Sequence, residues 1–272
     1  MLLAIVAAVT IPFNWTPGQI EVAVKINGTP ATFLLDTAAE FSVVSTRLAR
    51  QLGVVTTRRG GVDFVEGLDM EVGALKFERQ RLMVIPFDTY VDRGRQIDGL
   101  IGFDFFAAYT VGIDFQQKQL TVAPRQSFSP PEAAVAVPLA FVGRLPVVLA
   151  HVTLAGGELV QAKLVVDTGA SQSVMFRNPF SRAHRLFDRG GKESVSPSLA
   201  SGSHRVVDVG VDGVRVGGLT FDHPPAQAYL DWTGAAGSDS TDGLIGNALL
   251  SRYRIHVDYA NRLLFFEPVK KD

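Results

Sequence analysis

The feature that most constrains this chain is an internal duplication. The phrase LLDTAAEF at residues 34–41 returns as LVVDTGAS at residues 164–171, so that Asp36 matches Asp167 at a separation of 131 positions (167 − 36 = 131). Farther along, residues 97–122 align with residues 241–266, and each segment carries the pentapeptide DGLIG. The repeats predict two similar units, each of roughly 125 to 140 residues, which is an ordinary domain size.

A stretch rich in Pro and Ser separates the two copies. Residues 122–135 read VAPRQSFSPPEAAV and interrupt the apolar pattern, as a linker does. We therefore predict an N-terminal lobe at residues 1–125, a linker at 126–134 and a C-terminal lobe at 135–272.

Most other segments are short runs of β-branched residues bounded by Gly or Asn turns, a pattern typical of strands. We predict an all-β chain with few short helices. The predicted strands include residues 19–28, 29–37, 82–87, 120–124, 146–157, 161–168, 206–218 and 219–225. One helix is predicted over residues 45–53, where Ser45 can cap the first turn and Gly53 can end the last. Residues 178–187 are its weaker counterpart, and the residues after each DGLIG can add another short helix.

Composition excludes several classes of function. The 26 basic and 27 acidic side chains include no basic block that could neutralise a row of phosphates, so we expect no nucleic-acid partner. The chain has no cysteine, which excludes disulfides, thiolate nucleophiles and cysteine-bound metals. Its five histidines are scattered without the spacing of a zinc site, so we expect no metal.

The first nine residues, MLLAIVAAV, have two interpretations. They resemble the apolar part of a secretory signal, although they lack a basic start. Alternatively, Val6–Pro12 is a folded strand, because residues 131–138 repeat its wording just before the second copy. The compartment is therefore open, with a periplasmic or secreted location favoured over a cytoplasmic one.

The repeated phrase places a carboxylate at the end of an apolar strand. If two such turns face each other across a pseudo-twofold axis, both carboxylates cannot ionise comfortably, and the pair holds one proton between them. One carboxyl group can then act as a base toward a bound water while the other acts as an acid toward a carbonyl oxygen. This arrangement predicts amide hydrolysis without a metal, a cofactor or a covalent intermediate.

These residues carry a family resemblance. The chain resembles the aspartic proteases, because Thr follows each Asp and a Leu-Ile-Gly element lies downstream in both halves. It is pepsin-like in having two lobes and retropepsin-like in the sequence around each Asp. The resemblance implies the acid-protease fold, with two pseudo-twofold-related β-barrel-like lobes and an extended polypeptide substrate bound between them. It also implies a monomer, because the symmetry lies within one chain.

The same resemblance implies roles for individual residues. Asp36 and Asp167 correspond to the catalytic pair. The hydroxyl groups of Thr37 and Thr168 correspond to those that brace one aspartate loop against the other, with Gly169 as the small residue of the second loop.

The chain departs from the family pattern at two places. Ala38 stands where the pattern has Gly, so a methyl group enters the densest part of the site. That change leaves an alternative open, a catalytically inactive peptide-binding or scaffolding protein of the same fold. The region of the expected flap, residues 58–73, offers Gly60 and Gly61 as its tip but has no Tyr, and Phe64 is its aromatic candidate. Residues 198–207 occupy the corresponding place in the second half.

Four further acidic residues have simpler interpretations. Asp98 and Asp242 precede Gly and are predicted to be turn formers. Asp114 and Asp258 lie in apolar strands and are predicted to be edge or turn partners without a chemical role.

Overall fold

The computed structural model describes residues 8–16, 18–87, 96–198 and 202–269. In the first half the elements are β1 (Val9–Pro12), β2 (Asn14–Thr16), β3 (Gln19–Ile26), β4 (Thr29–Leu35), β5 (Val43–Ser45), α1 (Thr46–Gln51), β6 (Thr57–Arg59), β7 (Val62–Val72), β8 (Leu75–Ile85), β9 (Gly99–Ile101), α2 (Phe103–Ala108), β10 (Tyr109–Asp114), β11 (Gln119–Pro124) and the 3-10 helix η1 (Arg125–Ser127).

In the second half they are β12 (Val135–Pro138), β13 (Ala140–Val142), β14 (Leu145–Leu154), β15 (Leu159–Asp167), β16 (Val174–Phe176), α3 (Asn178–Ala183), β17 (Glu193–Ser198), β18 (Gly202–Asp208), β19 (Val211–Val216), β20 (Leu219–Asp222), β21 (Ala226–Tyr229), η2 (Gly234–Gly237), β22 (Gly243–Gly246), α4 (Asn247–Leu250), β23 (Tyr253–Asp258) and β24 (Leu263–Pro268). The chain is mostly strand with short helices, as the sequence predicts.

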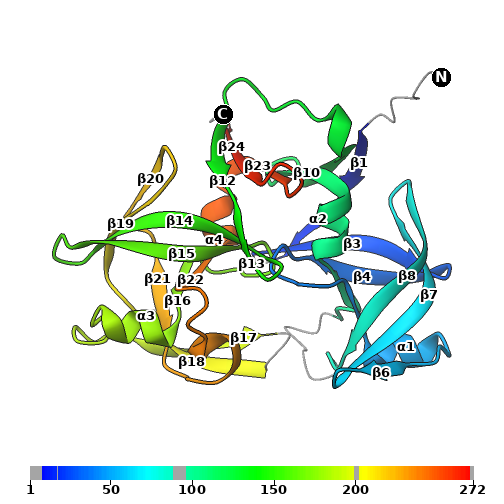
Figure 1. Ribbon diagram of the computed structural model, residues 1–272, viewed down its shortest axis with the longest axis horizontal. Coiled ribbons are helices and arrows are strands. Elements are labelled where there is room, and N and C mark those ends of the chain that lie inside the picture. Colours follow the sequence, from blue (N-terminus) through cyan, green and yellow to red (C-terminus); the bar gives the residue numbers. More distant parts are fainter. Residues whose placement is uncertain (1–7, 17, 88–95, 199–201, 270–272) are drawn as a thin grey trace.

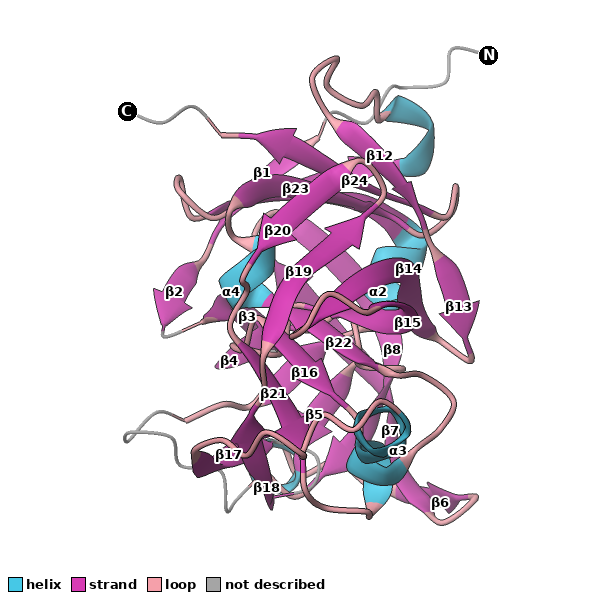
Figure 2. Cartoon of the chain, turned by 90° about the vertical axis from the view of Figure 1, so that its left-hand side faces the viewer, coloured by secondary structure: helices cyan, strands magenta, loops and turns pink. Residues whose placement is uncertain are grey.

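The strands form three sheets (Figure 1). An eight-stranded sheet comes from the first half, in the order β2-β3-β4-β9-β5-β8-β7-β6, and a ten-stranded sheet comes from the second half. A six-stranded sheet joins the halves in the order β1-β11-β10-β23-β24-β12 and lies at one end of the molecule (Figure 2). Its inner strands β10 and β23 pair across the two copies, which gives the sheet the symmetry of the repeat.

Each DGLIG element is a strand placed beside an aspartate-bearing strand. β9 runs parallel to β4 and antiparallel to β5, and β22 stands in the same relation to β15 and β16. This shared topology brings the carboxyl end of each aspartate strand against an apolar-apolar-Gly segment. This arrangement agrees with the acid-protease fold that the family resemblance implies.

The helix predicted over residues 45–53 is α1. The Ser45 side chain accepts a hydrogen bond from the Leu48 amide at 3.0 Å, and Gly53 has φ +64° beyond the last turn. Short helices α2 and α4 follow the two DGLIG elements, while α3 ends at Ala183, before the predicted limit of residue 187.

Three strand predictions differ from the structure. β8 begins at Leu75, seven residues before its predicted start at residue 82 (82 − 75 = 7), because its polar outer positions hide the alternation. The predicted run 206–218 is divided between β18 and β19 at Val209–Gly210. β1 begins at Val9, and Val6 lies outside the described residues. Within the described residues, no helix is long and apolar enough to cross a membrane.

Candidate active site

The two repeated aspartates lie in matching turns. Asp36 follows β4 and Asp167 ends β15. The amides of Ala38 and Ala39 donate to Asp36 Oδ1 at 2.8 and 3.0 Å, and the Gly169 amide donates to Asp167 Oδ1 at 2.9 Å. Each turn therefore fixes one oxygen of its carboxylate, and both residues stay partly accessible to solvent.

Two threonines lock the turns together. The Thr37 hydroxyl donates to the Val166 carbonyl at 2.6 Å and accepts the Thr168 amide at 3.0 Å. The Thr168 hydroxyl donates to the Leu35 carbonyl at 2.9 Å and accepts the Thr37 amide at 3.0 Å. Because both side chains are fully buried, this reciprocal set of four hydrogen bonds fixes one loop against the other. The geometry matches the bracing that the family resemblance implies.

Gly169 touches the carboxyl group of the opposite loop. A Cβ atom at this position would lie 2.6 Å from both Cγ and Oδ2 of Asp36, which real Cβ contacts do not allow. The corresponding position in the first loop is Ala38, whose methyl group is the departure noted in the sequence. Its amide nevertheless makes the hydrogen bond to Asp36, so the first loop keeps its turn with alanine in place.

The two carboxyl groups have raised pKa values. Burial raises the pKa of Asp36 to about 6, against the opposing effect of the Ala38 and Ala39 amides. Burial, followed by the negative charge of Asp36, raises the pKa of Asp167 to about 8, against the amides of its own loop and the charge of Arg177. The Asp36 carboxyl group also lies against Gly169, two residues after Asp167, so the two groups are close together. Between these values the pair holds one proton.

The glycines of the DGLIG elements allow close contact with the aspartate loops. A Cβ atom on Gly102 would lie 2.6 Å from the Phe41 carbonyl oxygen, and one on Gly246 would lie 2.5 Å from the Gln172 carbonyl oxygen. The Gly102 amide also donates to the Ser42 hydroxyl at 3.0 Å. The segments therefore support the loops from beneath, and a larger residue at either glycine would displace them.

Two residues that support the aspartate loops are not predicted from the sequence. The Tyr259 hydroxyl donates to the Thr37 carbonyl at 2.8 Å, and the Asn247 side-chain amide donates to the Thr168 carbonyl at 2.6 Å. Burial, with the nearby Asp36 and Asp167, raises the pKa of Tyr259 well above its usual range, so the hydroxyl remains a donor. The repeat carries a signal for both residues. Their counterparts 144 positions earlier are Phe115 and Phe103, which have no such donor.

The predicted flap region forms a hairpin. Gly60 and Gly61 have φ +58° and +82° and make the turn between β6 and β7. Phe64 lies on β7, only 9% exposed, and its ring meets the Phe41 ring edge-on at 6.1 Å beneath the guanidinium of Arg81. The aromatic candidate therefore packs against the first aspartate loop.

The second half has a longer hairpin at the corresponding place. β17 and β18 pair from Glu193 opposite Val207 to Ser198 opposite Gly202, and the turn at 199–201 lies outside the described residues. The Gln172 side chain donates to the Ser196 hydroxyl at 2.8 Å. This bond ties the hairpin to the loop of Asp167.

The turn-forming roles predicted for Asp98 and Asp242 are corrected by the structure. Asp98 accepts the distant Thr32 amide at 2.9 Å and forms an ion pair with Arg47, and Asp242 accepts the Lys163 amide at 2.7 Å. Both carboxylates tie the DGLIG element to the middle of the aspartate strand, at Thr32 of β4 and Lys163 of β15. Local spacing could not predict these contacts because the partners are 66 and 79 residues away.

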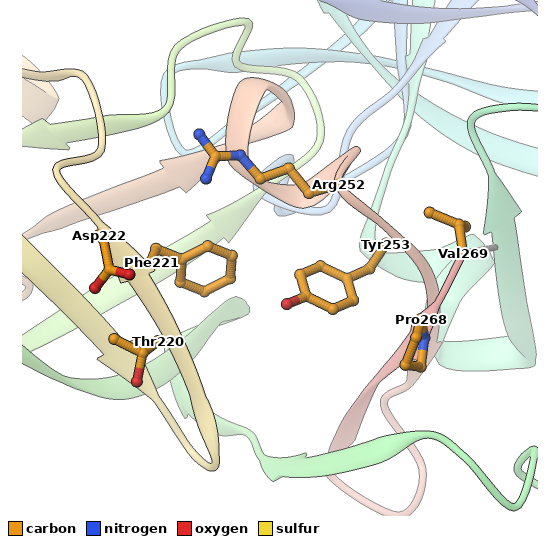
Figure 3. A pocket seen from close by; sticks show the side chains of 7 residues that line it. All are labelled: Thr220, Phe221, Asp222, Arg252, Tyr253, Pro268 and Val269. Atoms are coloured by element: carbon orange, nitrogen blue, oxygen red, sulfur yellow. The ribbon is translucent and has the colours of Figure 1, made fainter. Parts of the chain in front are cut away.

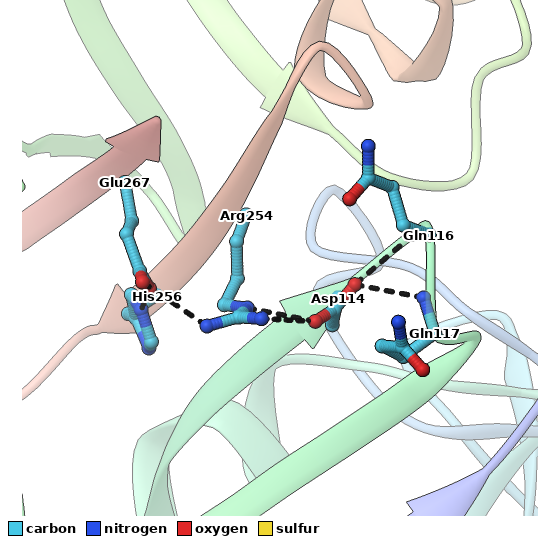
Figure 4. Close-up of polar contacts among 6 residues, drawn as sticks. All are labelled: Asp114, Gln116, Gln117, Arg254, His256 and Glu267. Carbon is cyan, nitrogen blue, oxygen red and sulfur yellow. Dashed lines mark hydrogen bonds and ion pairs between the residues drawn. The ribbon is translucent and has the colours of Figure 1, made fainter. Parts of the chain in front are cut away.

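Asp114 and Asp258 are turn partners, as predicted. Asp114 accepts the amides of Gln116 and Gln117 and forms an ion pair with Arg254 of the other half, which also contacts Glu267 (Figure 4). Asp258 accepts the amide of Asn261 at 3.1 Å. Among the described residues, no group of His, Asp or Glu is arranged to hold a metal ion.

A surface cavity of about 660 Å³ is lined by residues of the second half (Figure 3). Its lining residues are Thr220, Phe221, Asp222, Arg252, Tyr253, Pro268 and Val269. Neither aspartate loop contributes to it. The cavity is therefore separate from the candidate site formed by the turns of Asp36 and Asp167.

Comparisons with known proteins agree with this geometry. The family model described as aspartyl protease matches residues 22–105 and 150–249, which include both aspartate loops and both DGLIG elements. A search of curated proteins found no match. The crystal structure of an aspartic proteinase from Irpex lacteus is similar, with a TM-score of 0.57 and 14% sequence identity, over 97% of this chain and 98% of that chain.

Proposed function

Because this chain belongs to the aspartyl protease family, we propose that it is an active endopeptidase in which Asp36 and Asp167 hydrolyse peptide bonds. The observation that carries the proposal is the pair of carboxyl groups on mutually braced turns, with pKa values of about 6 and about 8. A pair poised in this way holds one proton near neutral pH, which is the state that acid-base hydrolysis requires.

The proposed reaction uses the one proton that Asp36 and Asp167 share, so that one carboxyl group is ionised and the other is protonated. The ionised group takes a proton from a water molecule as the water oxygen bonds to the peptide carbonyl carbon, while the protonated group gives its proton to the carbonyl oxygen. As the tetrahedral intermediate collapses, the first group returns its proton to the leaving nitrogen, the C–N bond breaks, and the second group takes a proton from a hydroxyl of the intermediate. The pair again holds one proton at the end.

The substrate of this reaction is a polypeptide bound in an extended conformation. Strand-like hydrogen bonds to the chain would give affinity, and pockets for alternate side chains would give specificity. The hairpins β6–β7 and β17–β18 are the candidates for covering it. Thr37 and Thr168 act by positioning the two loops and do not touch the reacting atoms.

The inactive alternative depends on the methyl group of Ala38. The Ala38 amide makes its hydrogen bond to Asp36, and the four threonine hydrogen bonds are intact. This geometry gives no support to a protein that has lost its reactive arrangement.

The proposal is tested by digestion of unfolded casein between pH 4 and pH 8, with and without pepstatin. We expect cleavage that pepstatin stops, and we expect Asp36→Asn or Asp167→Asn each to lower turnover at least tenfold, since neutralising either group removes a base or an acid. Asp188→Asn makes the same chemical change at an exposed ion pair and should leave turnover unaffected. Casein cleavage that persists in both active-site variants would refute the mechanism.

A further inference from the structure

The two sheets present different surfaces to the aspartate pair. Along β4, Phe33 and Leu35 point into the main core, so Leu34 and Asp36 lie on the opposite face. We call this the aspartate face of each sheet. In the first half it is an apolar cluster separate from the main core, made of Leu34, Val43, Phe87, Ile97 and Leu100, with Ala39, Met83 and Ile85 packed against it.

The strand register identifies the matching positions in the second half. Val43 pairs with Leu100 and with Met83, just as Met175 pairs with Leu244 and with Gln227. Two positions farther along the same strands, Ser45 therefore corresponds to Arg177, and Ile85 corresponds to Tyr229. Three positions before the Leu of each DGLIG, Ile97 corresponds to Thr241.

The aspartate face of the second sheet is therefore polar where that of the first sheet is apolar. Phe176 belongs to the main core, and strand alternation places Arg177 on the same face as Asp167. The neighbouring strand alternates in the same way, with Ala228 in the core and Tyr229 on the aspartate face. A cation and a phenol thus replace a serine and an isoleucine beside the reacting groups.

Arg177 has no anionic partner in contact. Within the described part of the chain its half-buried guanidinium makes no hydrogen bond or ion pair, whereas its counterpart Ser45 caps α1. Its charge interacts at longer range with Tyr229, Asp242 and Asp167. A partly desolvated guanidinium without a contacting anion is costly, and a planar carboxylate is the group that best satisfies it.

Two hydroxyl groups on this face are also unpaired. The Thr241 hydroxyl is buried and has no hydrogen bond, and among the described residues none is made by the Tyr229 hydroxyl. Burial raises the pKa of Tyr229 to about 12, so it remains a neutral donor. The nearby Asp231 is already engaged by the second hairpin, through the Arg205 amide at 2.9 Å and the His204 ring at 3.3 Å, while that ring packs on Tyr229.

We propose that Arg177, with Tyr229, binds a carboxylate of the peptide substrate on the side of the scissile bond that faces the second sheet. The inference rests on the proposed function and names its substrate class. The enzyme therefore prefers an acidic residue on that side. The carboxylate can belong to an Asp or Glu side chain or to the free C-terminus of a short peptide.

The test begins with a casein-derived peptide that the enzyme cuts, synthesised with both ends blocked. Glu, its neutral isostere Gln, and Lys are placed in turn at the two residues that flank the cut, and kcat/KM is measured for each peptide. We expect Glu to exceed Gln about tenfold at one of the two positions, which corresponds to ~1.4 kcal/mol. A shortened pair of peptides, with a free or an amidated C-terminus just after the cut, separates the two sources of carboxylate.

Substitutions assign the preference to Arg177. In Arg177→Met the ratio of Glu to Gln should fall to about one, and in Arg177→Glu the preference should pass to Lys. Arg185→Met removes an equal charge from an exposed pair with Asp188, outside both hairpins, and should leave the ratio unchanged. If Arg177→Met fails to fold, Arg177→Lys keeps the charge but not the bidentate geometry and should give an intermediate ratio.

The outcomes distinguish this inference from the function on which it rests. If no peptide is cut in a way that depends on Asp36 and Asp167, the proposed function fails. If peptides are cut but Glu and Gln are equivalent at both positions and at the C-terminus, the subsite is absent while the function stands. If the preference for Glu persists in Arg177→Met, another residue recognises the substrate carboxylate, and the assignment to Arg177 is overturned.

Discussion

At the scale of single residues, the two aspartate loops share the reciprocal threonine hydrogen bonds but differ beside the carboxyl groups, where the first loop has Ala38 and the second has Gly169. Gly169 has no room for a Cβ atom because Asp36 Cγ would lie 2.6 Å away, whereas Ala38 already carries one. The loops are therefore only approximately equivalent. This asymmetry makes opposite predictions for exchanging the two residues.

We predict that Gly169→Ala lowers kcat at least tenfold, because moving the Asp36 carboxyl group aside costs roughly 1–3 kcal/mol and displaces it from the shared proton. Ala38→Gly removes a methyl group and should raise kcat or leave it unchanged. Steady-state kinetics with a blocked peptide, alongside a thermal unfolding curve for each variant, checks both. A folded Ala38→Gly protein without activity would mean that the methyl group is a working part of the site.

A second residue-scale prediction concerns Tyr259. Tyr259→Phe leaves the buried Thr37 carbonyl without its donor, and we expect the free energy of unfolding to fall by about 1–3 kcal/mol. Urea denaturation measures the loss. Tyr253→Phe is the matched control, since the Tyr253 ring contacts Phe221 and Phe266 while its hydroxyl makes no hydrogen bond within the described residues. An equal effect in both variants would contradict a special role for Tyr259.

At the scale of secondary-structure elements, what the sequence predicts well is what depends on neighbouring residues. The limits of α1 follow from a capping Ser and a terminal Gly, both within one turn of the helix. Tyr259 and its partner Thr37 in the first aspartate loop are 222 residues apart in the chain, so no local sequence pattern predicts their contact. The polar residue in a repeat position otherwise filled by Phe is the one signal available, and it identifies a difference between the halves without identifying its partner.

The capping of α1 gives an element-scale prediction. Ser45→Ala removes the hydrogen bond to the Leu48 amide and should lower the free energy of unfolding by about 1 kcal/mol. Equilibrium urea denaturation provides the measurement. Ser127→Ala, at an exposed hydrogen bond to the Pro124 carbonyl, is the control and should change stability by less than about 0.5 kcal/mol. A change below that limit in Ser45→Ala would mean that packing alone holds this short helix.

At the scale of the whole molecule, the repeat predicts two similar lobes, and the structure joins them at a shared sheet and at the aspartate loops. The six-stranded sheet pairs β10 with β23, and the threonines connect loops that are 131 residues apart. What the repeat could not predict is how far the halves diverge on the faces beside the aspartates, where Ile85 corresponds to Tyr229. Two similar sheets that carry different side chains are suited to binding a substrate whose two halves differ chemically.

The shared proton also makes a prediction for the whole molecule. The pKa values of Asp36 and Asp167 in the folded state, about 6 and about 8, lie above the unfolded value near 3.9. The folded protein therefore binds more protons than the unfolded chain, and this contribution to stability is complete below about pH 4 and is lost as pH rises through 6 and then 8. The Asp167→Asn variant has no carboxyl group at this position, so it avoids the loss of stability that the wild type undergoes when Asp167 ionises. We expect the variant to gain stability relative to the wild type between pH 4 and pH 8, by at least ~1.4 kcal/mol, the value of one pKa unit.

Denaturation curves at a series of pH values measure this gain, and Asp188→Asn, at an exposed ion pair, should follow the wild type throughout.

The same pair of pKa values sets the pH range in which the enzyme is active. Ala39 and Ala170 lack the side-chain hydroxyl that would lower the pKa of each carboxyl group, so the effect of burial is opposed by backbone amides and, at Asp167, by the charge of Arg177. Activity on a neutral peptide should follow a bell with flanks near pH 6 and pH 8. An optimum below about pH 3.5, or a stability difference that does not grow with pH, would show that the pair ionises as ordinary aspartates do.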